Sequence, residues 1–198
     1  MNKKTCLIIT GPTAAGKTDL AIELAQKYNT QIISADSRQC YKELNIGVSK
    51  PTPNQLQQMH HYFINSHSIQ DEVNVKIFEK YALDAVYAVF ENNDVAIMVG
   101  GTGLYIKAFC EGIDEVPQVN EEIRKKINAT YNVKGLSWLQ EELKIKDPVY
   151  FSAGEMQNPQ RMMRALEVKL STGISITDFQ SGKKVTRDFK INTIHLDI

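Results

Sequence analysis

The segment "GPTAAGKT", residues 11–18, constrains the fold more than any other feature, because it satisfies the pattern G-x-x-x-x-G-K-[ST]. An apolar run, "CLIIT", precedes it, and Leu20, Leu24 and Tyr28 follow it at helical spacing. Glycines let such a loop wrap so that its backbone N–H groups point inward, and the helix N-terminus adds partial positive charge. The sequence therefore predicts a phosphate-binding loop, or P-loop, between a strand and a helix.

The side chains of this loop indicate a chain of phosphates and a magnesium ion. Lys17 neutralises terminal phosphate oxygens, and the Thr18 hydroxyl is a ligand for Mg²⁺. Backbone amides and one lysine make no contact that would identify an adenine, so the motif predicts a diphosphate rather than ATP. The predicted diphosphate-binding residues are Gly11, Pro12, Thr13, Ala14, Ala15, Gly16, Lys17 and Thr18.

Apolar runs and helical patterns continue to alternate along the chain. The runs "QIISA" and "DVAIMVGG" indicate strands, and residues 75–91 have an amphipathic helical pattern after Asn74, a residue suited to an N-cap. Residues 41–73 contain two prolines and indicate an irregular connection with one short helix around "PNQLQQMHHYF". Strands that alternate with helices predict an α/β fold, with a P-loop NTPase-like parallel sheet covered by helices on both faces.

Residues 114–150 have a different character, because they are rich in Lys and Glu. They contain helical patterns at residues 120–131 and 137–144 with no strand pattern between them. We interpret them as a small all-helical insertion. The catalytic core is then expected to comprise residues 1–113 and 151–198.

The C-terminal part of the chain holds one further helix and one strand pattern. Asn158 as N-cap, Pro159 at the first helical position and Gly173 as C-cap predict a helix over "PQRMMRALEVKLST". The chain stops on "INTIHLDI", which has the pattern of a strand. From a final strand with nothing to cover it, we expect the chain to be truncated at its C-terminus.

The composition and the cysteines bear on the cellular compartment of the protein, but they do not identify a partner. Lys plus Arg (23) equals Asp plus Glu (23), so the net charge neither supports nor excludes a nucleic acid. The apolar run near the N-terminus is short and passes into the P-loop instead of a cleavage site, so we expect a cytoplasmic protein without a membrane span. Cys6, Cys40 and Cys110 show no CxxC spacing, which predicts reduced core residues and neither a disulfide framework nor a zinc site.

Asp36 ends the second apolar run, and the residues alone leave three interpretations of its carboxylate open. As a Walker-B-type carboxylate it would hold Mg²⁺, and the protein would be a small P-loop kinase. As a general base it would remove a proton from a nucleophile that attacks beside the diphosphate. As a capping residue it would only stabilise the turn that follows.

Five segments, by their order and separations, favour the second interpretation: "GPTAAGKT", "ISADSRQCYKELNIGVSKP", "HHYFIN", "VGGTGLYIKA" and "NPQRMMRALE". Together they resemble the tRNA dimethylallyltransferases, also called the IPP transferase family, over nearly the whole chain. The resemblance implies a monomer whose P-loop holds dimethylallyl diphosphate with Mg²⁺. It further implies that the dimethylallyl group passes to N6 of the adenosine 3′-adjacent to the anticodon in tRNA.

The resemblance also implies roles for individual residues. Asp36 matches the family's base, Thr13 places a hydroxyl at the leaving diphosphate, and the helical insertion grips the anticodon stem. A target base has to leave its stack to reach such a centre, where polar side chains replace its lost pairing. The residues expected to contact tRNA are Asp36, Ser37, Arg38, Gln39, Thr102, Arg124, Gln160, Arg161, Met162, Met163 and Arg164.

Three of these arginines have a simpler interpretation as ordinary surface charges. Arg161 and Arg164 lie on one face of the predicted helix, where they either contact RNA phosphates or pair with Glu155 or Glu167. Arg124 belongs to a charge run, and such a run on a helix is usually a solvated face.

The methionines and histidines also have structural interpretations. Met162 and Met163 are of a type that fills cores. His60 and His61 are adjacent, so on a regular element they point in different directions, and we predict that both are structural.

Three other functions compete with prenyl transfer. A P-loop small-molecule kinase would turn over ATP without RNA, and an adenylate isopentenyltransferase would use a free adenine nucleotide as acceptor. The helical insertion favours tRNA over a free nucleotide, since a small acceptor needs no such clamp. Asp36, Thr13 and Lys17 argue against a non-catalytic nucleotide-binding module.

Overall fold

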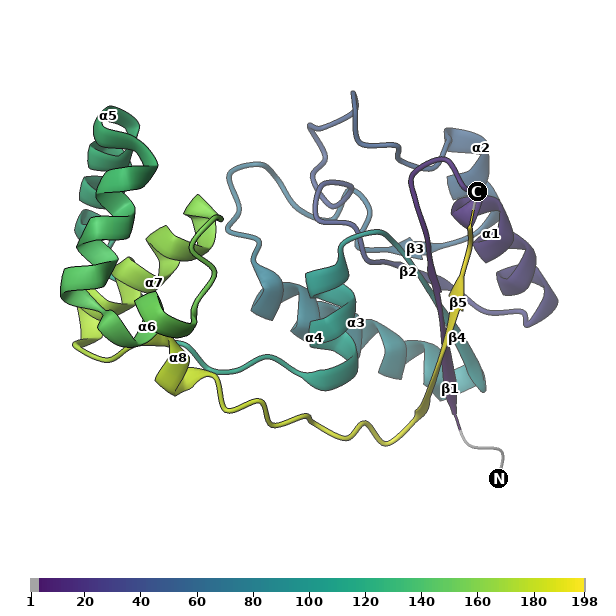
Figure 1. The fold of residues 1–198 in the computed structure, drawn as a ribbon. Coiled ribbons are helices and arrows are strands. Elements are labelled where there is room, and N and C mark those ends of the chain that lie inside the picture. The colour runs from purple at the N-terminus through teal and green to yellow at the C-terminus, as the bar shows by residue number, and fades with distance from the viewer. Residues whose placement is uncertain (1–3, 198) are drawn as a thin grey trace. The chain divides into compact units, whose positions relative to one another are not determined.

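The computed structural model describes residues 4–197, which form two compact units (Figure 1). The first unit runs to Ile113 and resumes at Lys184, and the second unit comprises residues 114–183. Residues 1–3 of the predicted core and residue 198, the end of the predicted last strand, lie outside the described residues.

The first unit is built on a five-stranded sheet in the order β3-β2-β4-β1-β5, in which every neighbouring pair is parallel. The strands are β1 (Thr5–Thr10), β2 (Ile32–Ser34), β3 (His61–Tyr62), β4 (Val95–Val99) and β5 (Lys190–His195). The helices of this unit are α1 (Lys17–Lys27), α2 (Pro53–Gln58), α3 (Val75–Asn92) and α4 (Gly103–Glu111). The predicted α/β fold with a parallel sheet is confirmed.

Alternate residues of the central strands pack on opposite faces of this sheet. On one face, Ile8 of β1 belongs to a buried cluster with Phe78 of α3 and Phe109 of α4. On the other face, Ile9 of β1 packs in a cluster with Ile22 of α1. Helices therefore cover both faces, and the loops that follow the strands are left to form a site at the carboxyl edge.

Helices α1 and α3 begin in different ways, and the difference matters for function. The Asn74 side chain accepts hydrogen bonds from the backbone N–H groups of Lys76 and Ile77, so the first turn of α3 is capped as predicted. Helix α1 begins after Gly16, a left-handed residue without a side-chain cap. The N–H groups of its first turn therefore lack a side-chain acceptor, which suits an anion.

The second unit contains α5 (Glu121–Lys146), α6 (Pro148–Ala153), α7 (Pro159–Thr172) and α8 (Ile176–Phe179). Ile127, Leu139 and Leu143 of α5 share one buried cluster with Met162 and Leu166 of α7. This cluster is the core of the unit.

The start and end of α7 agree with the caps expected for it. The Asn158 side chain accepts hydrogen bonds from two backbone N–H groups of the first turn, and Gly173 closes the helix in the left-handed region with φ 75°.

The expected division of the chain is wrong at its second boundary. Residues 151–183 belong to the helical unit and not to the core, because the apolar stripe of α7 is buried against α5. The two helical patterns expected at 120–131 and 137–144 lie on either side of the non-helical Gly135, with φ 72°, where α5 is kinked. The sequence patterns also did not indicate β3, α6 and α8, which are two, six and four residues long.

Two further expectations concern membranes and thiols. Every helix within residues 4–197 is too short or too polar to cross a bilayer. Cys6 and Cys40 are buried and Cys110 is partly buried, and all three are free thiols. Burial raises the pKa of the Cys40 thiol to about 11, so this thiol is protonated at neutral pH.

Candidate active site

A cavity of about 580 Å³ lies in the first unit, where the loops after β1, β2 and β4 meet. All of the predicted diphosphate-binding residues except Ala15 line it. Asp36 and Gln39, from the turn after β2, line the same cavity, as do Lys50 and His61. The structure thus brings the P-loop and Asp36 together.

The P-loop has a backbone conformation that depends on its glycines. Gly11 has a φ of 141° and Gly16 a φ of 79°, both in the region that favours glycine. A Cβ atom at Gly11 would lie 2.4 Å from the carbonyl oxygen of Leu196, so the neighbouring chain also leaves no room for a side chain. Lys17 Nζ donates a hydrogen bond to the carbonyl oxygen of Pro12, which holds the ammonium group over the loop.

The Asp36 carboxylate caps the turn that follows it. Its Oδ1 accepts hydrogen bonds from the backbone N–H groups of Arg38, at 2.9 Å, and Gln39, at 3.3 Å. The hydrogen bonds that a capping residue would make are therefore present, and they fix the half-buried carboxylate beside the cavity. No residue within 4–197 hydrogen-bonds Oδ2, so this oxygen is left for a metal ion or a proton.

Thr102 ties the turn that holds Asp36 to the loop after β4. Its hydroxyl oxygen accepts a hydrogen bond from the Ser37 backbone N–H at 3.0 Å and lies 3.4 Å from the Ser37 hydroxyl. The Thr102 backbone N–H donates to the carbonyl oxygen of Ala35 at 3.2 Å. Both interactions fix the backbone on either side of Asp36.

Gln39 acts as a second tie, from this turn to the loop that precedes α2. Its Nε2 donates to the carbonyl oxygens of Val48, at 3.3 Å, and Ser49, at 2.9 Å, and its Oε1 accepts from the Ser34 hydroxyl. The amide of Gln39 is thus engaged within the protein, whereas Arg38 is exposed to solvent.

Lys50 is a site residue that sequence reasoning missed. Its Nζ donates to the carbonyl oxygen of Tyr41 at 2.7 Å, to Asn65 Oδ1 at 2.7 Å and to Asn45 Oδ1 at 3.2 Å. An ammonium group has three donors, so the loop itself uses all of them. In the sequence this lysine stands in "VSKP", in a polar connection, and that pattern does not indicate its place in the cavity.

His61 was predicted to be structural, and the structure places it in the lining of the cavity as well. The residue is 8 % exposed, and its Nδ1 lies 2.9 Å from the carbonyl oxygen of Met59. Its Nε2 is buried without a hydrogen-bond partner among the described residues. Burial lowers the pKa of this imidazole, although the hydrogen bond to Met59 opposes the shift.

The cavity offers a limited set of oxygen ligands for a magnesium ion. The Thr18 hydroxyl and the carboxylates of Asp19 and Asp36 all line it. No cluster of three or more His, Cys, Asp or Glu residues that could hold a metal occurs within residues 4–197. The oxygens of Thr18, Asp19 and Asp36 are of the kind that Mg²⁺ takes in proteins, where phosphate oxygens and water complete its shell.

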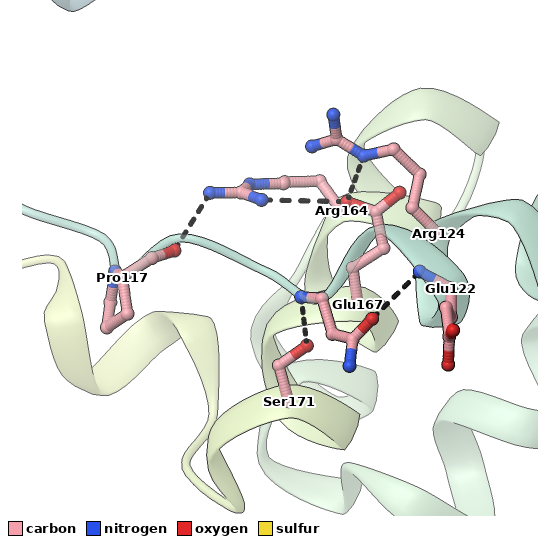
Figure 2. A network of polar contacts seen from close by, with 7 residues as sticks. Pro117, Glu122, Arg124, Arg164, Glu167 and Ser171 are labelled. Carbon is pink, nitrogen blue, oxygen red and sulfur yellow. Dashed lines mark hydrogen bonds and ion pairs between the residues drawn. The ribbon is translucent and has the colours of Figure 1, made fainter.

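The predicted arginines of the second unit are paired with glutamates. Arg161 lies 3.8 Å from Glu155, and Arg124 and Arg164 lie 3.3 and 3.5 Å from Glu167 (Figure 2). The simpler interpretation, ion pairing, is thus what the structure has for Arg161 and Arg164.

Met162 and Met163 were included among the expected tRNA contacts, and the structure contradicts this for their side chains. Both are buried in the core that α7 shares with α5, so neither thioether is accessible from the surface. Their alternative interpretation as core residues is correct. Gln160, on the first turn of α7, is exposed.

A family model described as IPP transferase matches residues 39–197 of the chain. This chain belongs to the IPP transferase family. The match includes Thr102, Arg124 and the whole of α7, and it begins three residues after Asp36. The P-loop and Asp36 thus lie outside the matched residues, and it is the structure that brings them together at one cavity.

Known proteins with the name tRNA dimethylallyltransferase are similar to this IPP transferase family member along nearly its whole length. That of Christiangramia forsetii is 45% identical over 188 residues, which cover 95% of this chain and 62% of that protein. That of Cytophaga hutchinsonii is 42% identical over 195 residues, which cover 98% of this chain and 64% of that protein. This chain thus spans less than two thirds of the length of these relatives.

Solved structures of similar proteins share its fold. The full-length tRNA isopentenylpyrophosphate transferase from Bacillus halodurans is 31% identical with a TM-score of 0.54, covering 88% of this chain and 57% of that chain. A eukaryotic dimethylallyltransferase acting on tRNA gives a TM-score of 0.76 over 98% of this chain and 48% of that chain. Its identity of 23% supports the fold alone.

Proposed function

We propose that this chain carries the catalytic unit of a tRNA dimethylallyltransferase. The reaction transfers a dimethylallyl group from dimethylallyl diphosphate to N6 of the adenosine 3′-adjacent to the anticodon in tRNA, and releases diphosphate. The observation that carries this proposal is that the P-loop and a fixed carboxylate, Asp36, line one cavity. Membership of the IPP transferase family and the names of the relatives support the choice of substrates.

The P-loop binds the diphosphate in this proposal. The N–H groups of the first turn of α1 donate to the phosphate oxygens, and Lys17 exchanges its bond to the Pro12 carbonyl for a phosphate oxygen. Thr13 lies exposed on the loop and supplies a hydroxyl to the leaving group. Mg²⁺ held by Thr18 would neutralise charge on the departing diphosphate.

Asp36 acts as the general base. The C–O bond of the allylic diphosphate breaks and its electron pair leaves with diphosphate, while the lone pair of the adenine N6 forms the new C–N bond. N6 then carries an excess proton, which Asp36 accepts. Since Oδ1 already accepts two backbone hydrogen bonds, Oδ2 is the oxygen that takes this proton.

The RNA contacts follow from the same site and from the second unit. The exposed Arg38 and the turn formed by Ser37 and Gln39 receive the flipped-out nucleotide, while Thr102 positions the turn. The exposed basic side chains of α5, Arg124 among them, hold the anticodon stem. The cysteines, reduced and mostly buried, fit a cytoplasmic location, and we expect a monomer.

The test uses the full-length protein with Mg²⁺, labelled dimethylallyl diphosphate and an anticodon stem-loop with adenosine 3′ to the anticodon. The key variant is Asp36→Asn, whose amide oxygen retains the hydrogen bonds from Arg38 and Gln39 but is a far weaker base. We expect label transfer to fall by about 10²–10⁴-fold while diphosphate binding stays intact. A stem-loop with guanosine at the target position is the acceptor control.

Other outcomes would identify a different enzyme. Transfer of label to free AMP but not to the stem-loop would indicate an adenylate isopentenyltransferase. Turnover of ATP without RNA, and no prenyl transfer, would mean that Asp36 is a metal ligand in a kinase.

A further inference from the structure

Glu167 is the one glutamate on α7, and its side chain is buried between two arginines. Only 5 % of the residue is exposed. Its Oε2 lies 3.3 Å from Arg124 Nε of α5 and 3.5 Å from Arg164 Nη1, one turn earlier on α7 (Figure 2). A buried carboxylate is stable only when it is paired, so the glutamate and the two guanidinium groups form one unit.

Arg164 makes its polar contacts inside the second unit. Its Nη1 is buried 3.5 Å from Glu167 Oε2 and has no hydrogen-bond partner among the described residues, and its Nη2 donates to the carbonyl oxygen of Pro117 at 3.4 Å. Close to this contact, the backbone N–H of Asn120 donates to the Ser171 hydroxyl, and the Asn120 side chain caps the first turn of α5. Arg164 thus holds the segment before α5 in place, and its side chain is less exposed (34 %) than that of Arg124 (50 %).

Arg124 is held by the same carboxylate but in a different way. It uses Nε toward Glu167, and none of the described residues hydrogen-bonds its two Nη groups. Half of its side chain is exposed, and Figure 2 shows the Nη atoms pointing away from Glu167. A guanidinium with both Nη groups available has the fork geometry that binds a phosphate.

We propose that Glu167 is a positioning residue that orients Arg124 toward a phosphate of the RNA substrate. The proposal rests on the proposed function, because it takes the phosphate to belong to the anticodon stem-loop. The two arginines and one glutamate leave a net positive charge, and Arg124 is the more exposed of the two arginines. Without its anchor, Arg124 would have to lose side-chain freedom on binding, and the contact would be lost because an exposed ion pair does not offset that cost.

The experiment compares Glu167→Gln, Arg124→Gln and the double variant with wild type, all in the full-length protein. Glu155→Gln is the matched control, because Glu155 pairs with the exposed Arg161 at 3.8 Å. The dissociation constant for the anticodon stem-loop is measured at several salt concentrations, together with the KM for dimethylallyl diphosphate and the melting temperature.

We expect Arg124→Gln and Glu167→Gln each to weaken RNA binding by about tenfold. The salt slope, which is the slope of the logarithm of the binding constant against the logarithm of the salt concentration, should become shallower by about one. The double variant should bind no more weakly than either single variant, because both changes remove one contact. The KM for dimethylallyl diphosphate should stay unchanged in every variant, and Glu155→Gln should bind RNA like wild type.

Two results would overturn the proposal. One is wild-type affinity and salt slope in Arg124→Gln. The other is a Glu167→Gln protein that melts earlier but binds RNA with the wild-type slope, since Glu167 would then only stabilise the fold. If Glu167→Gln does not fold, Glu167→Asp takes its place, because it keeps the charge but withdraws it by one methylene. A wild-type protein that binds diphosphate but no stem-loop would instead refute the proposed function.

Discussion

Among single residues, Thr102 connects the turn that holds Asp36 to the loop after β4 through its hydroxyl. In Thr102→Val the shape is kept, but the half-buried N–H of Ser37 loses its acceptor. We expect the free energy of unfolding to fall by about 1–3 kcal/mol, measured by urea denaturation. Label transfer should fall as well, because Asp36 precedes Ser37 directly. Thr102→Ser keeps the hydroxyl and should behave like wild type, and equal stability of Thr102→Val would contradict the argument.

His61 gives the first unit a pH-dependent stability. Burial lowers the pKa of this imidazole below its ordinary value, so the unfolded chain binds the proton more readily than the folded protein. The free energy of unfolding should therefore decline as the pH falls through about 6.5. The decline should end once the pH lies below the lowered pKa of the folded state. In His61→Asn this part of the decline should vanish.

The exposed His60 provides the control for this measurement. His60→Asn should keep the decline, because its neighbour remains. Thermal denaturation between pH 5 and 8, flanking the ordinary histidine pKa, compares the two variants. A His61→Asn protein with the wild-type pH dependence would show that other groups cause it. Hydrogen bonds to Ser68 and Lys184 lower the pKa values of Glu43 and Glu111, respectively. These two carboxylates therefore become protonated only at more acidic pH.

The residues of the site differ in how well the sequence predicts them. The P-loop and Asp36 are predictable, because short-range patterns specify both the loop and the end of the strand before Asp36. The placement of Lys50 and His61 in the cavity is not, since it depends on burial and on partners such as Tyr41 and Met59 in an irregular segment. The sequence around Lys50 and His61 indicates neither their burial nor their hydrogen-bond partners.

At the level of elements, the ends of β2 and β4 approach each other so closely that only glycine fits between them. A Cβ atom at Gly100 would lie 2.3 Å from the carbonyl oxygen of Ala35. Gly100→Ala should therefore lower the free energy of unfolding by about 2–3 kcal/mol, because the two strand ends have to separate. Separating the strand ends would also move the Ala35 carbonyl oxygen away from the Thr102 N–H, which donates a hydrogen bond to it.

Gly101 is the matched control, since a Cβ atom there meets nothing within 4 Å. Gly101→Ala should be close to wild type in urea denaturation. Similar losses in both variants would mean that backbone flexibility, and not the close approach, makes glycine necessary at Gly100.

Among the elements, those with capping residues and long periodic patterns are the ones that the sequence predicts. Helix α7 shows this, because Asn158, Pro159 and Gly173 mark its ends. The same helix shows the limit of such prediction, since its pattern indicates an apolar face but not which partner covers that face. The partner is α5, and this is why residues 151–183 belong to the helical unit.

On the scale of the whole molecule, the chain leaves the first unit and returns to it at nearly the same place. The backbone N–H of Val185 donates to the carbonyl oxygen of Glu111 at 2.8 Å. Arg187, two residues further on, donates to the carbonyl oxygen of Phe109 at 2.8 Å and to Glu79 at 2.7 Å. Both ends of the inserted segment are thus anchored within the first unit, independently of the residues between them.

This anchoring predicts that residues 114–183 are dispensable for the diphosphate site. Replacing them in the full-length protein by a short Gly-Ser linker should leave the first unit folded, because the ends to be joined are already adjacent. Calorimetric titration with inorganic diphosphate should give an affinity within about threefold of wild type, while stem-loop affinity falls by at least about tenfold as phosphate contacts are lost. Loss of diphosphate binding in a soluble, cooperatively unfolding variant would show that the helical unit also shapes the P-loop site. Retained stem-loop affinity would place the RNA contacts on the sheet unit, and the Glu167→Gln variant should then bind RNA normally too.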